Sequence, residues 1–231
     1  MISIEGNICF ANERVKKSAL RSGRNWEDIK IVAISKTFPA EYILEAVRYE
    51  IKDIGENKVQ EASSKYNVIG NKVKWHLVGH LQTNKVKRAL EIFDIIHSVD
   101  SVHLAEEISK KAEMVQKVAE VLVEVNATGE DSKFGVCPEK AVEFVKEISR
   151  LPNMAIMGLM TMGVFSENPE DSRKCFVTLR ELKEEIEKFD LGNGNMKYLS
   201  MGMSNDFEVA VEEGANLLRI GTAIFGKRKI Q

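Results

Sequence analysis

The chain has 231 residues, of which 44% are hydrophobic and 29% charged, a composition typical of a globular protein with a substantial core. Its net charge of -2 excludes the basic surface by which proteins bind nucleic acid or an anionic membrane. Cys9, Cys137 and Cys175 are odd in number and widely spaced, which favours reduced thiols over a disulfide framework. Neither a signal peptide nor an apolar stretch of about 18 residues is apparent, so we expect a cytoplasmic protein.

The first expected element is an amphipathic helix over residues 8–22, which would cover the outside or the bottom of the core. Short apolar or β-branched runs then alternate with charged segments of helical period. The predicted strands are residues 29–35, 51–55, 73–78, 92–99, 121–126, 155–161, 196–201 and 216–220. The predicted helices include residues 40–49, 102–117, 139–150, 172–189 and 205–213.

Eight strands alternating with helices predict parallel βαβ units. Two folds suit this length, an open doubly wound sheet and a (β/α)8 barrel of about 250 residues. The strand count favours the barrel, and the only Gly-x-Gly, at Gly192 and Gly194, precedes a strand and does not open a helix. No linker-like segment interrupts the pattern. We therefore predict one domain over residues 1–231, a single (β/α)8 TIM barrel with an additional N-terminal helix.

Lys36 directly follows the first predicted strand and precedes Thr37, Phe38 and Pro39. The active sites of such barrels lie at the C-terminal ends of the strands. A lysine held there can lose its proton by desolvation and form a Schiff base with an aldehyde. Taken alone, a lysine that extends from a strand end into solvent is the commoner case.

The turns after the last two predicted strands have the composition of a phosphate site. Gly202 and Gly221 would let the backbone approach an anion, while Ser200, Ser204 and Thr222 add hydroxyl groups. The alternative is that Ser204 only caps the following helix and Gly202 only turns the chain.

His76 and His80 have the i,i+4 spacing of zinc-binding helices, but they lie in or beside a strand. At about 3.3 Å per residue they would be roughly 13 Å apart. Two ligands of one zinc lie within about 4 Å of each other. We therefore predict no metal site, with His76 inside the barrel and His80 at the rim, in reach of a ligand. His97 and His103 have no evident companion.

Five segments from five strands resemble, in order, those of one family. They are Val-Ala-Ile-Ser-Lys36-Thr, Gly-Glu-Asn57-Lys-Val-Gln-Glu, Trp-His-Leu-Val-Gly-His80-Leu-Gln-Thr-Asn-Lys, Ser200-Met-Gly-Met-Ser-Asn-Asp206 and Arg219-Ile-Gly-Thr-Ala-Ile-Phe-Gly226. The family is that of the pyridoxal-phosphate homeostasis proteins, small barrels similar to the N-terminal domain of alanine racemase. The resemblance spans essentially the whole chain.

The resemblance implies that Lys36 carries pyridoxal 5'-phosphate (PLP) as an internal aldimine, a Schiff base. It also implies that Asn57 lies near the ring substituents and that Arg219 faces the pyridine nitrogen. The residues that would hold the phosphate are Ser204, Gly221 and Thr222. Further candidates for contact with the cofactor are His80, Ser200, Gly202 and Met203.

The implied role is PLP homeostasis, with PLP and apo forms of PLP-dependent enzymes as partners, for either a monomer or a weak dimer. Racemisation needs two acid/base groups, one on each face of the substrate. In alanine racemase the second is a tyrosine from an additional β-domain. This sequence ends at Gln231 after a short basic tail, and none of its four tyrosines has a matching context, so we expect little or no turnover.

Two alternatives stay open. One is a PLP-dependent racemase or eliminase of weak activity. The other is a PLP-independent barrel enzyme that acts on a phosphorylated sugar or aldehyde through Lys36.

Overall fold

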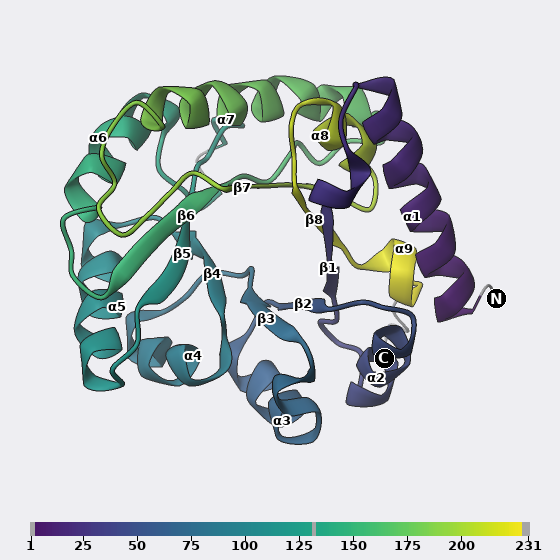
Figure 1. Ribbon diagram of the computed structural model, residues 1–231, viewed down its shortest axis with the longest axis horizontal. Coiled ribbons are helices and arrows are strands. Elements are labelled where there is room, and N and C mark those ends of the chain that lie inside the picture. Colours follow the sequence, from purple (N-terminus) through teal and green to yellow (C-terminus); the bar gives the residue numbers. More distant parts are fainter. Residues whose placement is uncertain (1–2, 131–132, 228–231) are drawn as a thin grey trace.

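Eight parallel strands, in chain order, form a closed barrel in the computed structural model, which describes residues 3–130 and 133–227. This confirms the predicted (β/α)8 fold (Figure 1). The basic tail that follows Lys227 lies outside the described residues. The strands are β1 Lys30–Ile34, β2 Asp53–Glu56, β3 Lys74–Leu77, β4 Ile95–Val99, β5 Ala119–Glu124, β6 Met154–Met160, β7 Tyr198–Met203 and β8 Leu217–Ile220.

Helices surround the barrel (Figure 1). They are α1 Ile4–Arg21, α2 Ala40–Arg48, α3 Val59–Ile69, α4 Val86–Ile92, α5 Val102–Met114, α6 Pro138–Ile148, α7 Arg173–Ile186, α8 Phe207–Glu212 and α9 Thr222–Phe225. Short 3-10 turns are η1 Trp26–Asp28, η2 Gly70–Lys72, η3 Thr83–Lys85 and η4 Pro169–Ser172.

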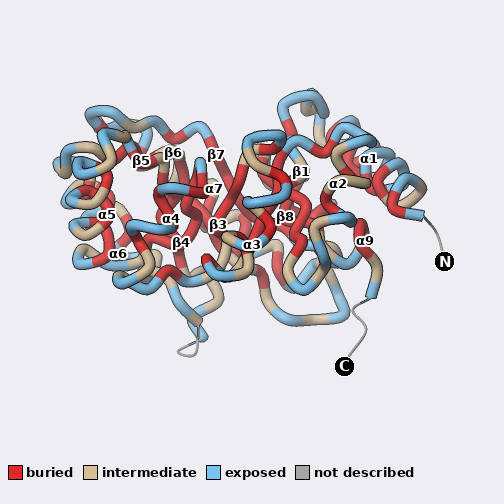
Figure 2. The backbone as a smooth tube through the Cα atoms, turned by 90° about the horizontal axis from the view of Figure 1, so that it is seen from below, coloured by how far each residue is buried: buried red, intermediate tan, exposed pale blue. Residues whose placement is uncertain are grey.

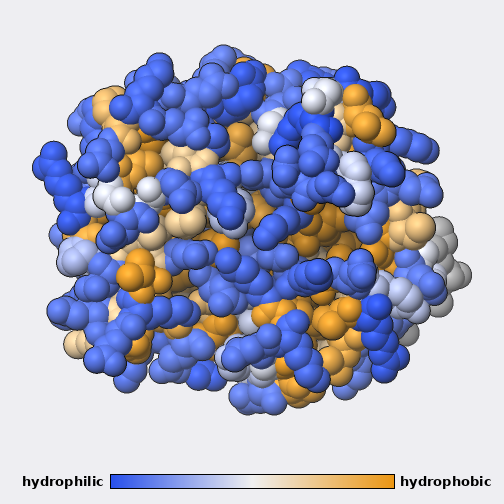
Figure 3. Space-filling model, viewed as in Figure 1, coloured by the Kyte–Doolittle hydropathy of each residue, from blue (hydrophilic) through white to orange (hydrophobic). Residues whose placement is uncertain are grey.

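The apolar side chains form two layers because neighbouring residues of a strand point to opposite faces of the sheet. The larger layer lies between the strands and the helices, and Figure 2 shows buried residues concentrated along the strands. The smaller layer fills the inside of the barrel, with Val32, Ile34, Leu122, Met160 and Leu217 among its members. The face seen in Figure 3 is largely hydrophilic, with smaller apolar areas between the charged side chains.

Helix α1 covers the outside of the barrel beside α8 and α9 (Figure 1). Arg14 pairs with Glu208 of α8 at 2.9 Å, and Ser18 Oγ donates to the Glu208 carbonyl oxygen at 2.8 Å. The helix begins at Ile4, one turn before the predicted start at residue 8, because Ser3 accepts a hydrogen bond from the Gly6 N–H and caps it.

Some predicted boundaries were wrong. The strand predicted over residues 92–99 begins only at Ile95, because Ile92 is the last residue of α4 and the Asp94 carboxylate binds the Trp75 N–H. The helix predicted over residues 205–213 is the shorter α8, which begins at Phe207. In the first case the apolar run crosses the end of an element, so periodicity alone misplaces that end, and in the second Asp206 precedes the helix as its N-cap.

Candidate functional site

A cavity of about 620 Å³ opens at the C-terminal ends of the strands. Its apolar walls include Ile34, Val78 and Met162. The structure brings together here seven of the residues predicted for the site, from the ends of β1, β2, β7 and β8. They are Lys36, Asn57, Met203, Ser204, Arg219, Gly221 and Thr222.

The backbone is fixed on both sides of Lys36. Thr37, which follows it, has a φ of 70°, a left-handed conformation that is strained for a β-branched residue. Its N–H donates to Glu61 Oε1 at 2.6 Å. On the other side, the Ser35 carbonyl oxygen accepts from Lys65 Nζ at 2.7 Å. These two bonds hold the sharp corner that places Lys36 at the cavity.

Lys65 joins this corner to a buried carboxylate. Its Nζ lies 2.6 Å from Glu56 Oε1 and 2.8 Å from Glu61 Oε1, and the Ser35 hydroxyl also donates to Glu56. Burial raises the pKa of Glu56, and the hydrogen bonds from Lys65 and Ser35 oppose that rise. Our sequence analysis missed this group, although the i,i+4 spacing of Glu61 and Lys65 is typical of a helical ion pair.

Arg219 of β8 reaches the cavity from a buried position. Its Nη1 donates to Ser200 Oγ at 2.6 Å and its Nη2 to the Thr161 carbonyl oxygen at 2.7 Å. Burial lowers the pKa of Arg219 to about 10, opposed by the Asp206 and Glu124 carboxylates, so the guanidinium is cationic at neutral pH. Ser200 itself is fully buried and supports Arg219 from behind the cavity lining.

Ser204 links the turns that follow β7 and β8. Its Oγ accepts from the Ala223 N–H of α9 at 3.2 Å. It does not cap α8, because the residue at the helix start is Asp206, whose Oδ1 accepts from the Met203 N–H at 2.6 Å. The two polar turns therefore form one connected unit at the edge of the cavity.

Gly202 serves packing and does not line the cavity. Its φ is 88°, and a Cβ built there would lie 2.5 Å from the Ala210 Cβ of α8. A side chain at this position would push α8 away from β7. The glycine thus permits close packing of helix on strand.

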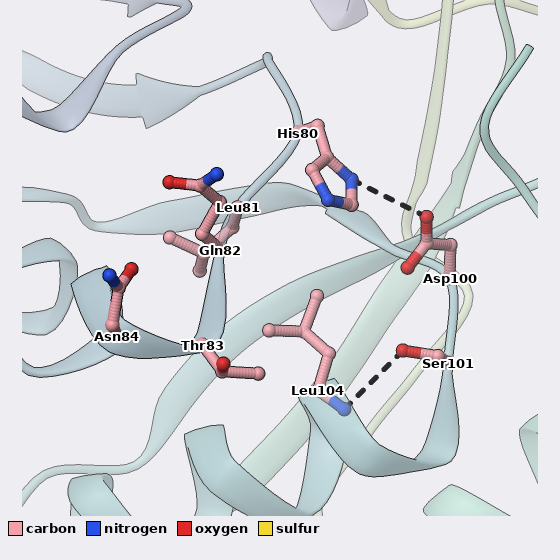
Figure 4. Close-up of a pocket in the computed structure, with 8 residues that line it drawn as sticks. All are labelled: His80, Leu81, Gln82, Thr83, Asn84, Asp100, Ser101 and Leu104. Carbon is pink, nitrogen blue, oxygen red and sulfur yellow. Dashed lines mark hydrogen bonds and ion pairs between the residues drawn. The ribbon is translucent and has the colours of Figure 1, made fainter.

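His80 lies in a second pocket, of about 460 Å³, and not in the cavity of Lys36. Figure 4 shows its ring directed toward Asp100, 3.6 Å away, across from the start of α5. The Phe134 ring stacks on the His80 ring, with the two ring centroids 4.0 Å apart. These two contacts hold His80 between Asp100, which directly follows β4, and Phe134, an arrangement that the position of His80 in the sequence does not reveal.

Asn57 has a buried Oδ1 that makes no hydrogen bond with the described part of the chain. An unpaired buried acceptor of this kind costs about 1–3 kcal/mol. Because Asn57 lines the cavity, a ligand that brings a hydrogen-bond donor would satisfy it.

His76 lies inside the barrel, as we predicted, with its ring buried. His97 was expected to have no companion, and this was wrong, since His97 Nε2 lies 2.9 Å from His76 Nδ1. Within the described ranges there is no group of three or more metal-ligating side chains and no helix long and apolar enough to cross a membrane.

The chain matches the family model of the alanine racemase N-terminal domain over residues 18–229. A pyridoxal phosphate homeostasis protein of Aquifex aeolicus is 46% identical over 218 residues, which is 94% of this chain and 95% of that protein. A mouse protein of the same name is 36% identical over 94% of this chain and 84% of its own length.

Solved structures show the same similarity. A protein of unknown function from Bifidobacterium adolescentis superposes with a TM-score of 0.90 at 32% identity, covering 96% of this chain and 94% of that one. PipY of Synechococcus elongatus with PLP bound has a TM-score of 0.80 at 33% identity, covering 93% of this chain and 99% of that one. An alanine racemase of Clostridium difficile, 16% identical, shares the fold over 57% of its length, with a TM-score of 0.73 and 96% of this chain covered. The chain thus belongs to the family of pyridoxal phosphate homeostasis proteins, which share the barrel of the alanine racemase N-terminal domain.

Proposed function

We propose that this protein binds PLP through Lys36 and serves in PLP homeostasis, holding the cofactor and delivering it to enzymes that need it. One observation carries the proposal: a lysine at a strand end, a buried arginine and two linked polar turns meet in one cavity. An amine forms a reversible covalent bond with an aldehyde such as that of PLP, and backbone and hydroxyl donors at the turns suit its phosphate.

The residues of the cavity fit the group. The apolar walls suit the faces of a pyridine ring, and the unpaired Asn57 Oδ1 offers an acceptor to a polar substituent. Ser204, Gly221 and Thr222 stand together where we place the phosphate. Arg219 provides an N–H donor for the ring nitrogen.

The relatives support the same function. Proteins named for PLP homeostasis match nearly the whole chain, and a similar protein has been solved with PLP bound. We also propose that the protein acts in the cytoplasm as a monomer or weak dimer whose partners are apo forms of PLP-dependent enzymes.

The test is reduction with borohydride of the protein incubated with PLP, followed by peptide mapping. The label should lie on the peptide that contains Lys36, and Lys36→Ala should lose both the label and the absorbance of the bound cofactor. Lys133→Ala is the matched control, because Lys133 lines the same cavity. A label on another lysine would contradict the assignment to Lys36. A protein that takes up no PLP would favour an enzyme that works on a phosphorylated aldehyde without it.

A further inference from the structure

Five buried polar side chains form one continuous row of hydrogen bonds inside the barrel. Arg219 Nη1 lies 2.6 Å from Ser200 Oγ, which lies 2.9 Å from His97 Nδ1. His97 Nε2 lies 2.9 Å from His76 Nδ1, and His76 Nε2 lies 2.9 Å from Asp53 Oδ1. The row therefore connects a residue of the cavity with the first residue of β2.

The row crosses the barrel and does not follow one sheet edge. His97 belongs to β4 and Ser200 to β7, strands that are not neighbours, so their bond spans the interior. None of the five residues is more than 8% exposed, and apolar side chains surround them. Buried polar groups are costly unless each is paired, and here each of the three inner members, Ser200, His97 and His76, has a partner on either side.

The chemistry of the two ends sets the direction of the outer bonds, and with uncharged rings it sets the direction of the inner bonds as well. A guanidinium only donates, and a carboxylate only accepts. Ser200 therefore accepts from Arg219 and gives its own proton to His97 Nδ1. The proton of His97 is then on Nε2, where it donates to His76 Nδ1, and the proton of His76 is on Nε2, where it donates to Asp53. Both rings are neutral in this arrangement.

The surroundings favour this arrangement over its reverse. Burial alone would raise the pKa of Asp53, but the hydrogen bond from His76 and the nearby charges of Lys30 and Lys74 lower it, so the carboxylate is ionised. Burial, together with the charges of Arg219 and Lys74, holds the pKa of His97 well below its usual value. If His97 carried its proton on Nδ1, Ser200 Oγ would accept two hydrogen bonds, one from Arg219 and one from His97. The hydroxyl proton of Ser200 would then lose the acceptor that it has here.

We propose that Ser200, His97, His76 and Asp53 are positioning residues, a directed hydrogen-bond relay that holds the Arg219 guanidinium in place for the ligand of the Lys36 cavity. The proposal rests on the proposed function for the ligand, and it adds a set of interior residues that do not themselves line the cavity. A fixed arginine is preorganised to meet the ring nitrogen, whereas a released one would lose rotamer freedom on binding.

The first test needs no ligand. Nitrogen-15 NMR of histidine-labelled protein at neutral pH should show His76 and His97 as neutral rings that carry their protons on Nε2. Ser200→Ala should shift the His97 Nδ1 resonance, because that nitrogen loses its donor. A charged ring, or a proton on Nδ1 of His97, would overturn the direction of the relay. This result stands whether or not the protein binds PLP, so it separates a failure of the relay from a failure of the proposed function.

The second test measures PLP affinity. Ser200→Ala should weaken binding roughly tenfold, the effect of one hydrogen bond to a charged group. Ser98→Ala is the matched control, because Ser98 is a buried serine of β4 whose Oγ donates to the Gly79 carbonyl oxygen at 2.8 Å, outside the relay. It should bind PLP as the wild type does.

A second variant, His97→Phe, keeps a planar ring and removes both relay bonds of that residue. The double variant, Ser200→Ala with His97→Phe, should bind PLP no more weakly than whichever single variant binds it more weakly, because both substitutions break the same connection. Additive losses, or equal losses in Ser200→Ala and Ser98→Ala, would show a general effect on stability and overturn the positioning role. Where a variant does not fold, the NMR result on the wild type decides.

Discussion

At the scale of single residues, Lys65 stabilises the corner that carries Lys36. It is buried, and its Nζ neutralises Glu56, a carboxylate with no exposed surface. The removal of one partner of a buried ion pair leaves an uncompensated charge, which costs more than the pair contributes. A change at Lys65, which does not itself line the cavity, is therefore expected to affect the position of the lysine that we propose binds PLP.

Lys65→Met should lower the free energy of unfolding by about 3 kcal/mol, because it leaves Glu56 buried without its cation. Urea denaturation measures the change. Lys146→Met is the control, since its pair with Glu143 is exposed and should contribute within about 0.5 kcal/mol. Equal stability of the two variants would show that the buried pair has no special role.

The buried carboxyl group of Glu124 should make the free energy of unfolding depend on pH. Burial and the nearby Asp100 carboxylate raise its pKa to about 7, opposed by Arg219. The folded protein therefore keeps a proton that the unfolded chain releases at lower pH. This contribution to stability is complete below the unfolded pKa and is lost as the pH rises through about 7.

Glu124→Gln has no carboxyl group at this position and should not lose stability in this way. Its free energy of unfolding, relative to that of the wild type, should therefore rise by about 3 kcal/mol from roughly pH 4 to pH 8. Unfolding at a series of pH values gives the difference. Glu147→Gln, at an exposed position of α6, should show no such trend. A flat difference for Glu124→Gln as well would mean that the carboxylate ionises normally in the folded protein.

At the scale of elements, the turns after β7 and β8 act as one unit because Ser204 accepts from the Ala223 N–H. Neither turn holds a helix long enough to stabilise an anion by itself, since α8 has 6 residues and α9 has 4. The phosphate that we place here would depend on the two turns together.

Ser204→Asp should weaken PLP binding at least about a hundredfold, because a carboxylate would face a phosphate dianion. Ser204→Asn is the control, since its amide oxygen can still accept from Ala223 and carries no charge. Equilibrium titration with PLP measures both. If the Ser204→Asp and Ser204→Asn variants bind PLP with the same affinity, the phosphate lies elsewhere in the cavity.

At the scale of the whole molecule, Lys36 lines the cavity together with the titratable side chains of Lys133, Glu167 and Asp206. None of the four tyrosines lines it: Tyr42 and Tyr49 are on or next to α2, Tyr66 is on α3, and Tyr198 is buried in the barrel interior. Arg219 is cationic at neutral pH and would oppose protonation of the ring nitrogen, which weakens PLP as an electron sink. Both features favour a protein that holds the cofactor over one that turns over amino acids.

We therefore expect transfer of PLP to an apo-enzyme and racemisation of alanine and serine far below about 1 per second. Transfer is followed by the recovered activity of the recipient, and racemisation by chiral analysis, with Lys36→Ala as the blank for both. Racemisation at or above that rate would favour the weak racemase over the carrier.

The sequence by itself determined the barrel, since eight apolar runs alternate with helical segments, and it determined the place of Lys36, because a residue that follows a parallel strand lies at the C-terminal rim. It also identified the two polar turns from local composition. Only the tertiary structure decided that His80 turns to Asp100, that Ser200 supports Arg219 from behind, and that Gly202 serves packing. The Lys65 network and the row from Asp53 to Arg219 also depend on it. Most of these contacts join different strands, helices or turns, and which side chains meet depends on strand register and closure of the barrel, which local patterns do not encode.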